Sequence, residues 1–169
     1  MALKHEGQRV GIFVDVQNMY HSAKRIHNAR VNFDAILKSA SAGRMLQRAR
    51  AYVVTSHSGD EEEQFFDTLA AQGYDVQVQD LRVFSGGAKK ADWDVGMAVD
   101  IMRFASRLDV VVIVTGDGDF VPLIEYLQNQ GVQVEAMAFR ESSAQMLTER
   151  VDEFVDLSAN KRKYLLRIK

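Results

Sequence analysis

The chain of 169 residues alternates short apolar runs with longer amphipathic stretches. The most apolar run, 110–114, reads Val-Val-Val-Ile-Val, and a β-branched run this short predicts a strand buried on both faces. Apolar runs at 9–15, 50–55 and 132–139 predict three further strands. The segment 74–80 alternates apolar and polar residues, which is typical of a half-exposed strand at the edge of a sheet.

The stretches between these strands have the spacing of helices. Helices are predicted over 16–29, 34–43, 60–73, 92–108 and 120–130, with another beginning near 142. The segment 151–157 mixes apolar and acidic residues and fits neither a helix nor a strand. Alternation of strands and helices predicts an α/β fold, a three-layer α/β/α sandwich around a mainly parallel, five-stranded sheet.

One stripe of the predicted helix 92–108 is apolar except for its first member, Asp94. The apolar members are Met97, Ala98, Ile101, Ala105 and Leu108. A carboxylate on an apolar stripe is unfavourable unless a helix N-terminus, a hydrogen-bond donor or a metal compensates it. On the same projection Asp92 lies roughly opposite, and Asp100 falls beside the stripe.

Composition limits the class of protein. The absence of cysteine excludes disulfides and thiolate metal sites. No apolar run approaches the roughly 20 residues that span a bilayer, and the first residues do not resemble a signal peptide, so we expect a cytoplasmic protein with no membrane partner. The formal net charge of −2 means that nucleic-acid binding would have to use local basic patches.

Length and charge also suggest a division of the chain. We expect one domain over 1–157 and a basic C-terminal tail over 158–169. The tail carries an apolar stripe, so it packs on the domain, binds a partner or contacts nucleic acid; the alternative is a solvated, partly frayed end. A homodimer is left open.

Two of the predicted strands end in acidic loops. Asp15 ends the first, and Asp117 and Asp119 follow 110–114 within the run Thr-Gly-Asp-Gly-Asp. Ligands of open α/β sheets bind beyond the carboxyl ends of strands, so these carboxylates and Asp94 converge if the two strands are neighbours. Oxygen ligands without cysteine suit Mg²⁺ or Mn²⁺, which activate water for in-line displacement at phosphorus.

Each aspartate also has a purely structural interpretation. Asp15 is placed to cap the helix that follows it, and Asp119 to cap a helix beginning at Phe120. In that case the Gly-Asp-Gly-Asp loop is an ordinary turn, with its glycines allowing a tight backbone bend. Asp94 would then be compensated by the N-terminus of its own helix.

Cationic residues near these acids are the candidates for substrate binding. Lys89 and Lys90 lie in a glycine-rich segment just before the helix that carries Asp94, although this segment is equally consistent with a plain linker. Lys24 and Arg25 lie in the helix after Asp15, and Arg140 follows the strand 132–139. These side chains would contact RNA phosphates.

Three segments of the chain resemble the NYN domain, and more closely its LabA-like branch. They are 13–18 (FVDVQN), 90–100 (KADWDVGMAVD) and 114–120 (VTGDGDF), within a resemblance that covers about 9–157. NYN domains are relatives of PIN nucleases. The resemblance implies a PIN-like parallel sheet of strand order 3-2-1-4-5 and a metal-dependent ribonuclease site.

The resemblance also assigns individual residues. The acidic metal-binding positions of the family match Asp15, Asp94, Asp117 and Asp119. The asparagine of the motif matches Asn18, and its small hydroxyl residue matches Thr115. Asp100 matches a further acid of the family, but its place beside the apolar stripe ranks it second.

The first functional hypothesis is therefore a Mg²⁺- or Mn²⁺-dependent ribonuclease with RNA as its partner. The alternative is a non-catalytic RNA-binding or regulatory protein that retains the acidic pocket, and the net negative charge favours it slightly. A haloacid-dehalogenase phosphatase would need Asp-x-Asp-x-Thr after the first strand, and a Toprim enzyme a glutamate there. Asp15-Val-Gln-Asn18 fits neither pattern.

Overall fold

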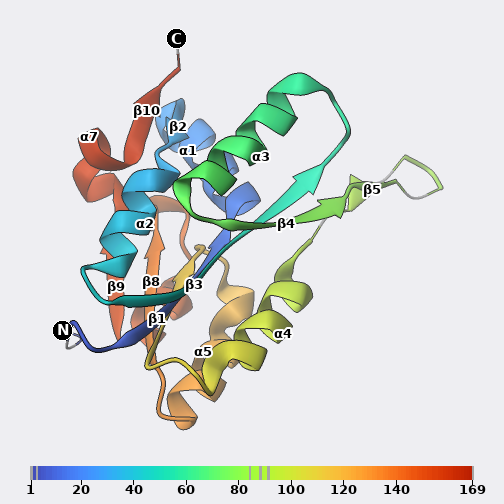
Figure 1. Ribbon diagram of the computed structural model, residues 1–169. Helices are drawn as coiled ribbons and strands as arrows, with labels where there is room; N and C mark the ends of the chain where they lie inside the picture. Colours follow the sequence, from blue (N-terminus) through green and yellow to red (C-terminus); the bar gives the residue numbers. More distant parts are fainter. Residues whose placement is uncertain (1, 3, 84, 88, 91, 169) are drawn as a thin grey trace.

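A computed structural model describes residues 2, 4–83, 85–87, 89–90 and 92–168. A six-stranded sheet with the order β4-β3-β1-β7-β8-β9 runs through the molecule, and all its neighbouring strands are parallel (Figure 1). The strands are β1 (Arg9–Asp15), β3 (Met45–Thr55), β4 (Asp75–Asp80), β7 (Val110–Val114), β8 (Gln133–Ala138) and β9 (Glu153–Asp156).

This order confirms the predicted arrangement 3-2-1-4-5 and adds β9 beyond the fifth strand. The predicted strand count was one too low because all four residues of β9 are half-buried, so they show neither a fully apolar run nor an alternation. β4, at the opposite edge, has the half-exposed pattern that its sequence predicted. The α/β class is confirmed.

Helices cover both faces of the sheet, which makes three layers (Figure 1). The helices are α1 (Val16–His27), α2 (Phe33–Ser41), α3 (Asp60–Gln72), α4 (Asp94–Ala105), α5 (Val121–Asn129), α6 (Gln145–Arg150) and α7 (Lys161–Tyr164). Within the described ranges, no helix has the length and apolar character required to cross a membrane.

The central strands supply both cores through the alternation of their side chains. Val10, Ile12 and Val14 of β1 join the core beneath α1, α2 and α3, and Phe13 joins the core beneath α4, α5 and α6. Each of these side chains is fully buried, and burial of one such side chain contributes about 1.5–3 kcal/mol. The apolar stripe predicted on α4 faces the second core, with Met97 and the rest of its helical members buried or half-buried.

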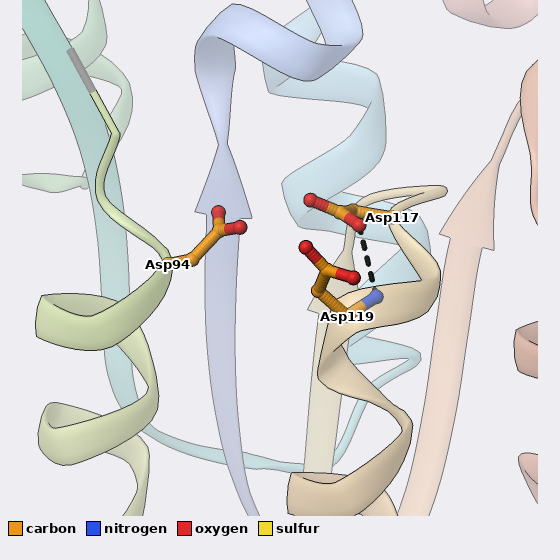
Figure 2. Close-up of side chains that lie close together, drawn as sticks. All are labelled: Asp94, Asp117 and Asp119. Atoms are coloured by element: carbon orange, nitrogen blue, oxygen red, sulfur yellow. Dashed lines mark hydrogen bonds between the residues drawn. The ribbon is translucent and has the colours of Figure 1, made fainter. Parts of the chain in front are cut away.

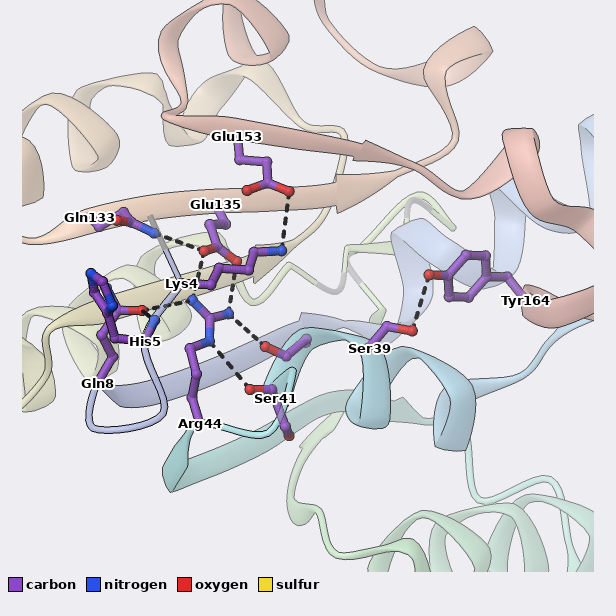
Figure 3. Close-up of polar contacts among 11 residues, drawn as sticks. Lys4, His5, Gln8, Ser39, Ser41, Arg44, Gln133, Glu135, Glu153 and Tyr164 are labelled. Carbon is purple, nitrogen blue, oxygen red and sulfur yellow. Dashed lines mark hydrogen bonds and ion pairs between the residues drawn. The ribbon is translucent and has the colours of Figure 1, made fainter. Parts of the chain in front are cut away.

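Shorter elements complete the chain. They are the strands β2 (Ala29–Val31), β5 (Arg82–Val83), β6 (Lys89–Lys90) and β10 (Leu165–Arg167), and the 3-10 helices η1 (Gly118–Phe120), η2 (Arg140–Ser142) and η3 (Leu157–Asn160). β10 pairs with β2, and the hydroxyl of Tyr164 lies 3.1 Å from Ser39 Oγ (Figure 3). Up to Arg167, the basic tail therefore packs on the domain.

A buried ion pair lies toward the amino-terminal end of the sheet (Figure 3). The guanidinium of Arg44, just before β3, makes two bonds to the carboxylate of Glu135 on β8, with Nη1–Oε1 at 2.8 Å and Nη2–Oε2 at 3.0 Å. Gln133 donates to the same carboxylate, and the backbone oxygens of Ala40 and Ser41 accept from Arg44. The partners satisfy both buried charges, as such a pair requires.

Candidate metal centre

A cleft of about 820 Å³ opens beyond the carboxyl ends of β1 and β7. The two strands are paired through Val14 and Val114, so the acidic loops that follow them are neighbours. The cleft is lined by Asp15, Gln17, Asn18, His21, Ser22, Lys24, Arg25, Asp92, Trp93, Asp94, Asp117 and Ser142. This is the sheet edge at which open α/β folds bind ligands.

Three aspartates converge at this edge (Figure 2). Asp94 is the first residue of α4, Asp117 lies in the loop after β7, and Asp119 lies in η1. One carboxylate oxygen from each lies within 4.8 Å of the others. Asp94 and Asp117 are half-buried and Asp119 is exposed, so the cluster faces outward and is accessible to a hydrated cation.

Asp15 lies in the same cleft but is held by the protein. Its Oδ1 accepts the backbone N–H of Asn18 at 3.1 Å, which caps α1, and its Oδ2 accepts from Thr115 Oγ1 at 3.2 Å. Burial raises the pKa of Asp15, and the charges of Asp117 and Asp92 add to the rise, while the two hydrogen bonds oppose it. The capping interpretation of Asp15 is therefore confirmed, and Asp15 lines the acidic cleft, but the cluster of three aspartates in the described structure does not include it. Its predicted role as a metal ligand stays a prediction.

The loop after β7 is ordered by hydrogen bonds to its own polar side chains. Thr115 is fully buried, and its Oγ1 accepts the N–H of Asp117 at 3.3 Å. Asn18 Oδ1 accepts the N–H of Gly116 at 3.1 Å, which connects the loop to α1. Asp117 Oδ1 accepts the N–H of Asp119 at 2.9 Å, so Asp117 caps the 3-10 turn, and the proposed capping by Asp119 was wrong.

The two glycines of this loop allow another segment to pack closely against it. A Cβ at Gly116 would lie 2.7 Å from Ser143 Oγ, and one at Gly118 would lie 2.9 Å from the Cβ of Ala144. The carbonyl of Gly116 also accepts the N–H of Ala144 at 2.9 Å. Neither glycine has a positive φ, so the close approach of the segment before α6, and not the predicted tight bend, is what requires glycine here.

The electrostatics of the cluster fit a divalent cation. Burial, followed by hydrogen bonding to Asp92 and Asp117 and the charges of these two residues, raises the pKa of Asp94 to about 8. The rise reflects first the withdrawal of this carboxylate from water and then the two carboxylates beside it, which would otherwise repel it. Clustered carboxylate oxygens without sulfur ligands are the donor set of a hard ion such as Mg²⁺ or Mn²⁺.

Asp92 and Trp93 are site residues that the sequence pattern missed. The helical projection placed Asp92 opposite Asp94, but α4 begins only at Asp94, so the projection does not apply to Asp92. Its Oδ1 instead accepts the N–H of Asp94 at 2.7 Å, and it lines the cleft. Trp93 Nε1 donates to the backbone oxygen of Val53 at 2.8 Å, which fixes the indole in the cleft wall.

The predicted cationic residues divide into three groups. Lys24 and Arg25 line the cleft. Arg140 is outside the described lining of the cleft. Its Nε lies 3.6 Å from Asp156 Oδ2, and its guanidinium lies over the ring of Phe154. The backbones of Lys89 and Lys90 form β6, but their side chains fall outside the described part of the structure.

Asp100 contributes to packing outside the described lining of the cleft. Its Oδ2 accepts from Arg50 Nη1 and from the hydroxyl of Tyr52, each at 2.9 Å. Burial and the neighbouring Asp100 charge raise the pKa of Tyr52, so the phenol remains a donor. These bonds join α4 to β3.

Comparisons with known proteins agree with the fold. The model of the NYN domain matches residues 9–158. The "low amplitude and bright protein LabA" of Synechococcus elongatus is 24% identical over 157 residues, which cover 89% of this chain and 84% of that protein. A crystal structure of a Vibrio parahaemolyticus protein of unknown function has a TM-score of 0.87 and 27% identity, covering 98% of this chain and all of the other. The chain therefore belongs to the NYN domain family, a family of PIN-like nucleases, and to its LabA-like branch.

Proposed function

We propose that this protein is a metal-dependent ribonuclease that hydrolyses phosphodiester bonds in RNA. The observation that carries the proposal is the convergence of Asp94, Asp117 and Asp119 within 4.8 Å at the carboxyl end of the sheet. Family membership supports a nuclease, and the adjoining cleft provides room for a nucleotide.

The residues of the cluster have distinct roles in this proposal. Asp94, Asp117 and Asp119 would hold Mg²⁺ or Mn²⁺, which when bound lowers the pKa of a coordinated water and neutralises phosphate charge. Asp15 keeps a fourth carboxylate beside them, in a position set by Thr115. In hydrolysis the water oxygen bonds to phosphorus, the phosphorus–oxygen ester bond breaks, and the leaving oxygen takes up a proton.

Other residues would bind and orient the RNA. Asn18 uses its side-chain oxygen to hold Gly116, which leaves its amide nitrogen to donate to a phosphate oxygen. Lys24 and Arg25, which also line the cleft, would provide positive charge for the phosphates. Lys89 and Lys90 remain candidates for the same role from the segment before α4.

The decisive experiment incubates the purified protein with mixed RNAs in Mn²⁺ and in EDTA, beside an Asp117→Asn variant. Asp67→Asn is a matched control, because Asp67 is an exposed aspartate of α3 outside the cleft. We expect cleavage by the wild type and Asp67→Asn only in Mn²⁺, and none by Asp117→Asn. Cleavage that persists in EDTA or in Asp117→Asn would contradict the proposal.

A second readout tests the metal without relying on activity. A ligand that binds only the folded protein raises its melting temperature, so Mn²⁺ should stabilise the wild type and Asp67→Asn but not Asp117→Asn. RNA binding without Mn²⁺-dependent cleavage would instead support the alternative of a non-catalytic RNA-binding or regulatory protein. The net charge of −2 is the observation that slightly favours this alternative over the ribonuclease.

A further inference from the structure

A second hollow of about 400 Å³ lies on the other side of α1, between this helix and the start of α3. Its walls include Tyr20 from α1 and Phe65 and Phe66 from α3. Gln17 and His21, one helical turn apart, line both this hollow and the acidic cleft. The two cavities therefore adjoin along α1, where these two residues lie between them.

The spacing of residues along α1 explains this arrangement. Positions three or four residues apart share a helix face, so Asn18, Ser22 and Arg25 together line the acidic cleft. Val16 and Tyr20 share another face and line the second hollow. A ligand that has one group in the cleft can therefore place its next group in the hollow by crossing a single turn of helix.

The chemistry of the second hollow selects a flat, uncharged group. Tyr20 is 43% exposed, and the rings of Phe65 and Phe66 are half-buried with centroids 6.1 Å apart. The described lining contains no lysine or arginine, and Lys24, which lines the acidic cleft, places its Nζ 5.9 Å from the centre of the Tyr20 ring. Hydrogen bonds, first of all from Thr55, lower the pKa of Glu62, so this wall of the hollow carries a negative charge that repels phosphate.

We propose that the second hollow is a base-binding subsite, which takes an unpaired nucleobase of single-stranded RNA while a neighbouring phosphate lies in the acidic cleft. This inference rests on the proposed ribonuclease function and specifies its substrate class. Stacking on aromatic rings accepts every base, because each base has a π-face. A base in a duplex would have to leave its stack first, so the subsite selects single strands.

The test separates base binding from catalysis by using the Asp117→Asn protein in EDTA, in which no hydrolysis is expected. The probes are a pentaribonucleotide and versions of it with one abasic ribose at each position in turn, and their affinities are measured by fluorescence anisotropy. In this background, we expect one abasic position to weaken binding about tenfold. Adding Tyr20→Ala should cause a loss of similar size and remove the effect of that abasic position, whereas Tyr20→Phe, which retains the ring, should not.

Tyr126→Ala is the matched control, because Tyr126 on α5 is 42% exposed and lies outside the described lining of both cavities. Thermal melts of each variant show that the fold is retained. Equal effects of the abasic position with and without Tyr20, or no measurable binding of the pentaribonucleotide, would overturn the base-binding subsite.

The outcomes distinguish this inference from the proposed function. Suppose that Tyr20→Ala removes the effect of one abasic position, but the wild type does not cleave RNA in Mn²⁺. This result supports the subsite and rejects the ribonuclease. Mn²⁺-dependent cleavage by the wild type without such coupling retains the ribonuclease and rejects the subsite.

Discussion

Asp94 is the residue through which pH should change the stability of the metal-free protein. Its pKa of about 8 in the folded state lies above its ordinary value of 3.8, mainly because of burial, so the folded protein binds this proton more tightly than the unfolded chain does. Stability should therefore fall as pH rises between these two values. The elevated pKa of Asp15 acts in the same direction.

Thermal melts in EDTA at about pH 5 and about pH 8 check this expectation. We expect a lower melting temperature at the higher pH, and a smaller difference for Asp94→Asn. Three other carboxyls have lowered pKa values, so their contribution to stability is lost only at pH values below this range: Asp109, Glu62 and Glu141. They therefore do not change the expected difference between about pH 5 and about pH 8. A melting temperature that rises across the window in EDTA would contradict the prediction.

The buried pair of Arg44 and Glu135 makes a second prediction at the scale of residues. Their side chains are 1% and 3% exposed, so Glu135→Gln leaves a buried guanidinium without its counter-charge. We expect the free energy of unfolding, measured by urea denaturation, to fall by about 3–5 kcal/mol. Glu153→Gln, which removes the more exposed pair with Lys4, should cost at most about 1 kcal/mol, and equal losses in the two variants would contradict this account.

Among the elements of the fold, the loop between β7 and η1 depends most on its packing partner. Gly116→Ala would place a Cβ 2.7 Å from Ser143 Oγ and 3.0 Å from the Cα of Ser143. Since this backbone atom cannot move aside alone, the loop that carries Asp117 should shift. We expect a loss of about 1–3 kcal/mol in stability and weaker binding of Mn²⁺.

The single tryptophan of the chain provides the measurement, because Trp93 lines the cleft beside Asp94. Mn²⁺ bound in the cleft should quench its fluorescence, and the concentration dependence gives the affinity. Gly7→Ala is the control, because a Cβ at Gly7 meets no atom within 4 Å in the described structure. Unchanged Mn²⁺ affinity in Gly116→Ala would contradict the prediction, because the metal site would then not depend on the position of this loop.

For the whole molecule, the net charge of −2 makes RNA binding depend on a few local cations. In the Asp117→Asn background in EDTA, replacing Lys24 and Arg25 together by Ala should weaken binding of all single-stranded sequences. The slope of log affinity against log salt should become shallower by about 1.4, because each neutralised phosphate of a single strand contributes about 0.7 to it. The same double replacement at Lys89 and Lys90 tests whether their segment also contacts phosphate.

Filter binding at several salt concentrations gives both the affinity and the slope. Arg103 and Arg107, which are exposed and lie outside the described lining of the cleft, are the matched pair for the control. Their replacement by Ala should leave both quantities unchanged. An unchanged slope after replacement of Lys24 and Arg25 would remove α1 from the path of the RNA.

The sequence by itself determined the central strands and the ends that carry the acids. Runs such as 110–114 predict strands that are buried on both faces, as the structure shows. Asp15 ends one such run, and Asp117 follows another after Thr115 and Gly116. The strand order came from the resemblance of three motifs to a known family. β9 was missed because a half-buried strand of four residues has no distinctive periodicity.

Only the tertiary structure decided which carboxylates meet and how each is held. Asp94, Asp117 and Asp119 share one region, whereas Asp15 is bonded to Thr115, which lies 100 residues away in the chain. Hydrophobic periodicity reports the environment of one element at a time, with a period of 2 or 3.6 residues. The distance between side chains on different elements depends on strand pairing, helix packing and the close approach of loops, which no local pattern contains.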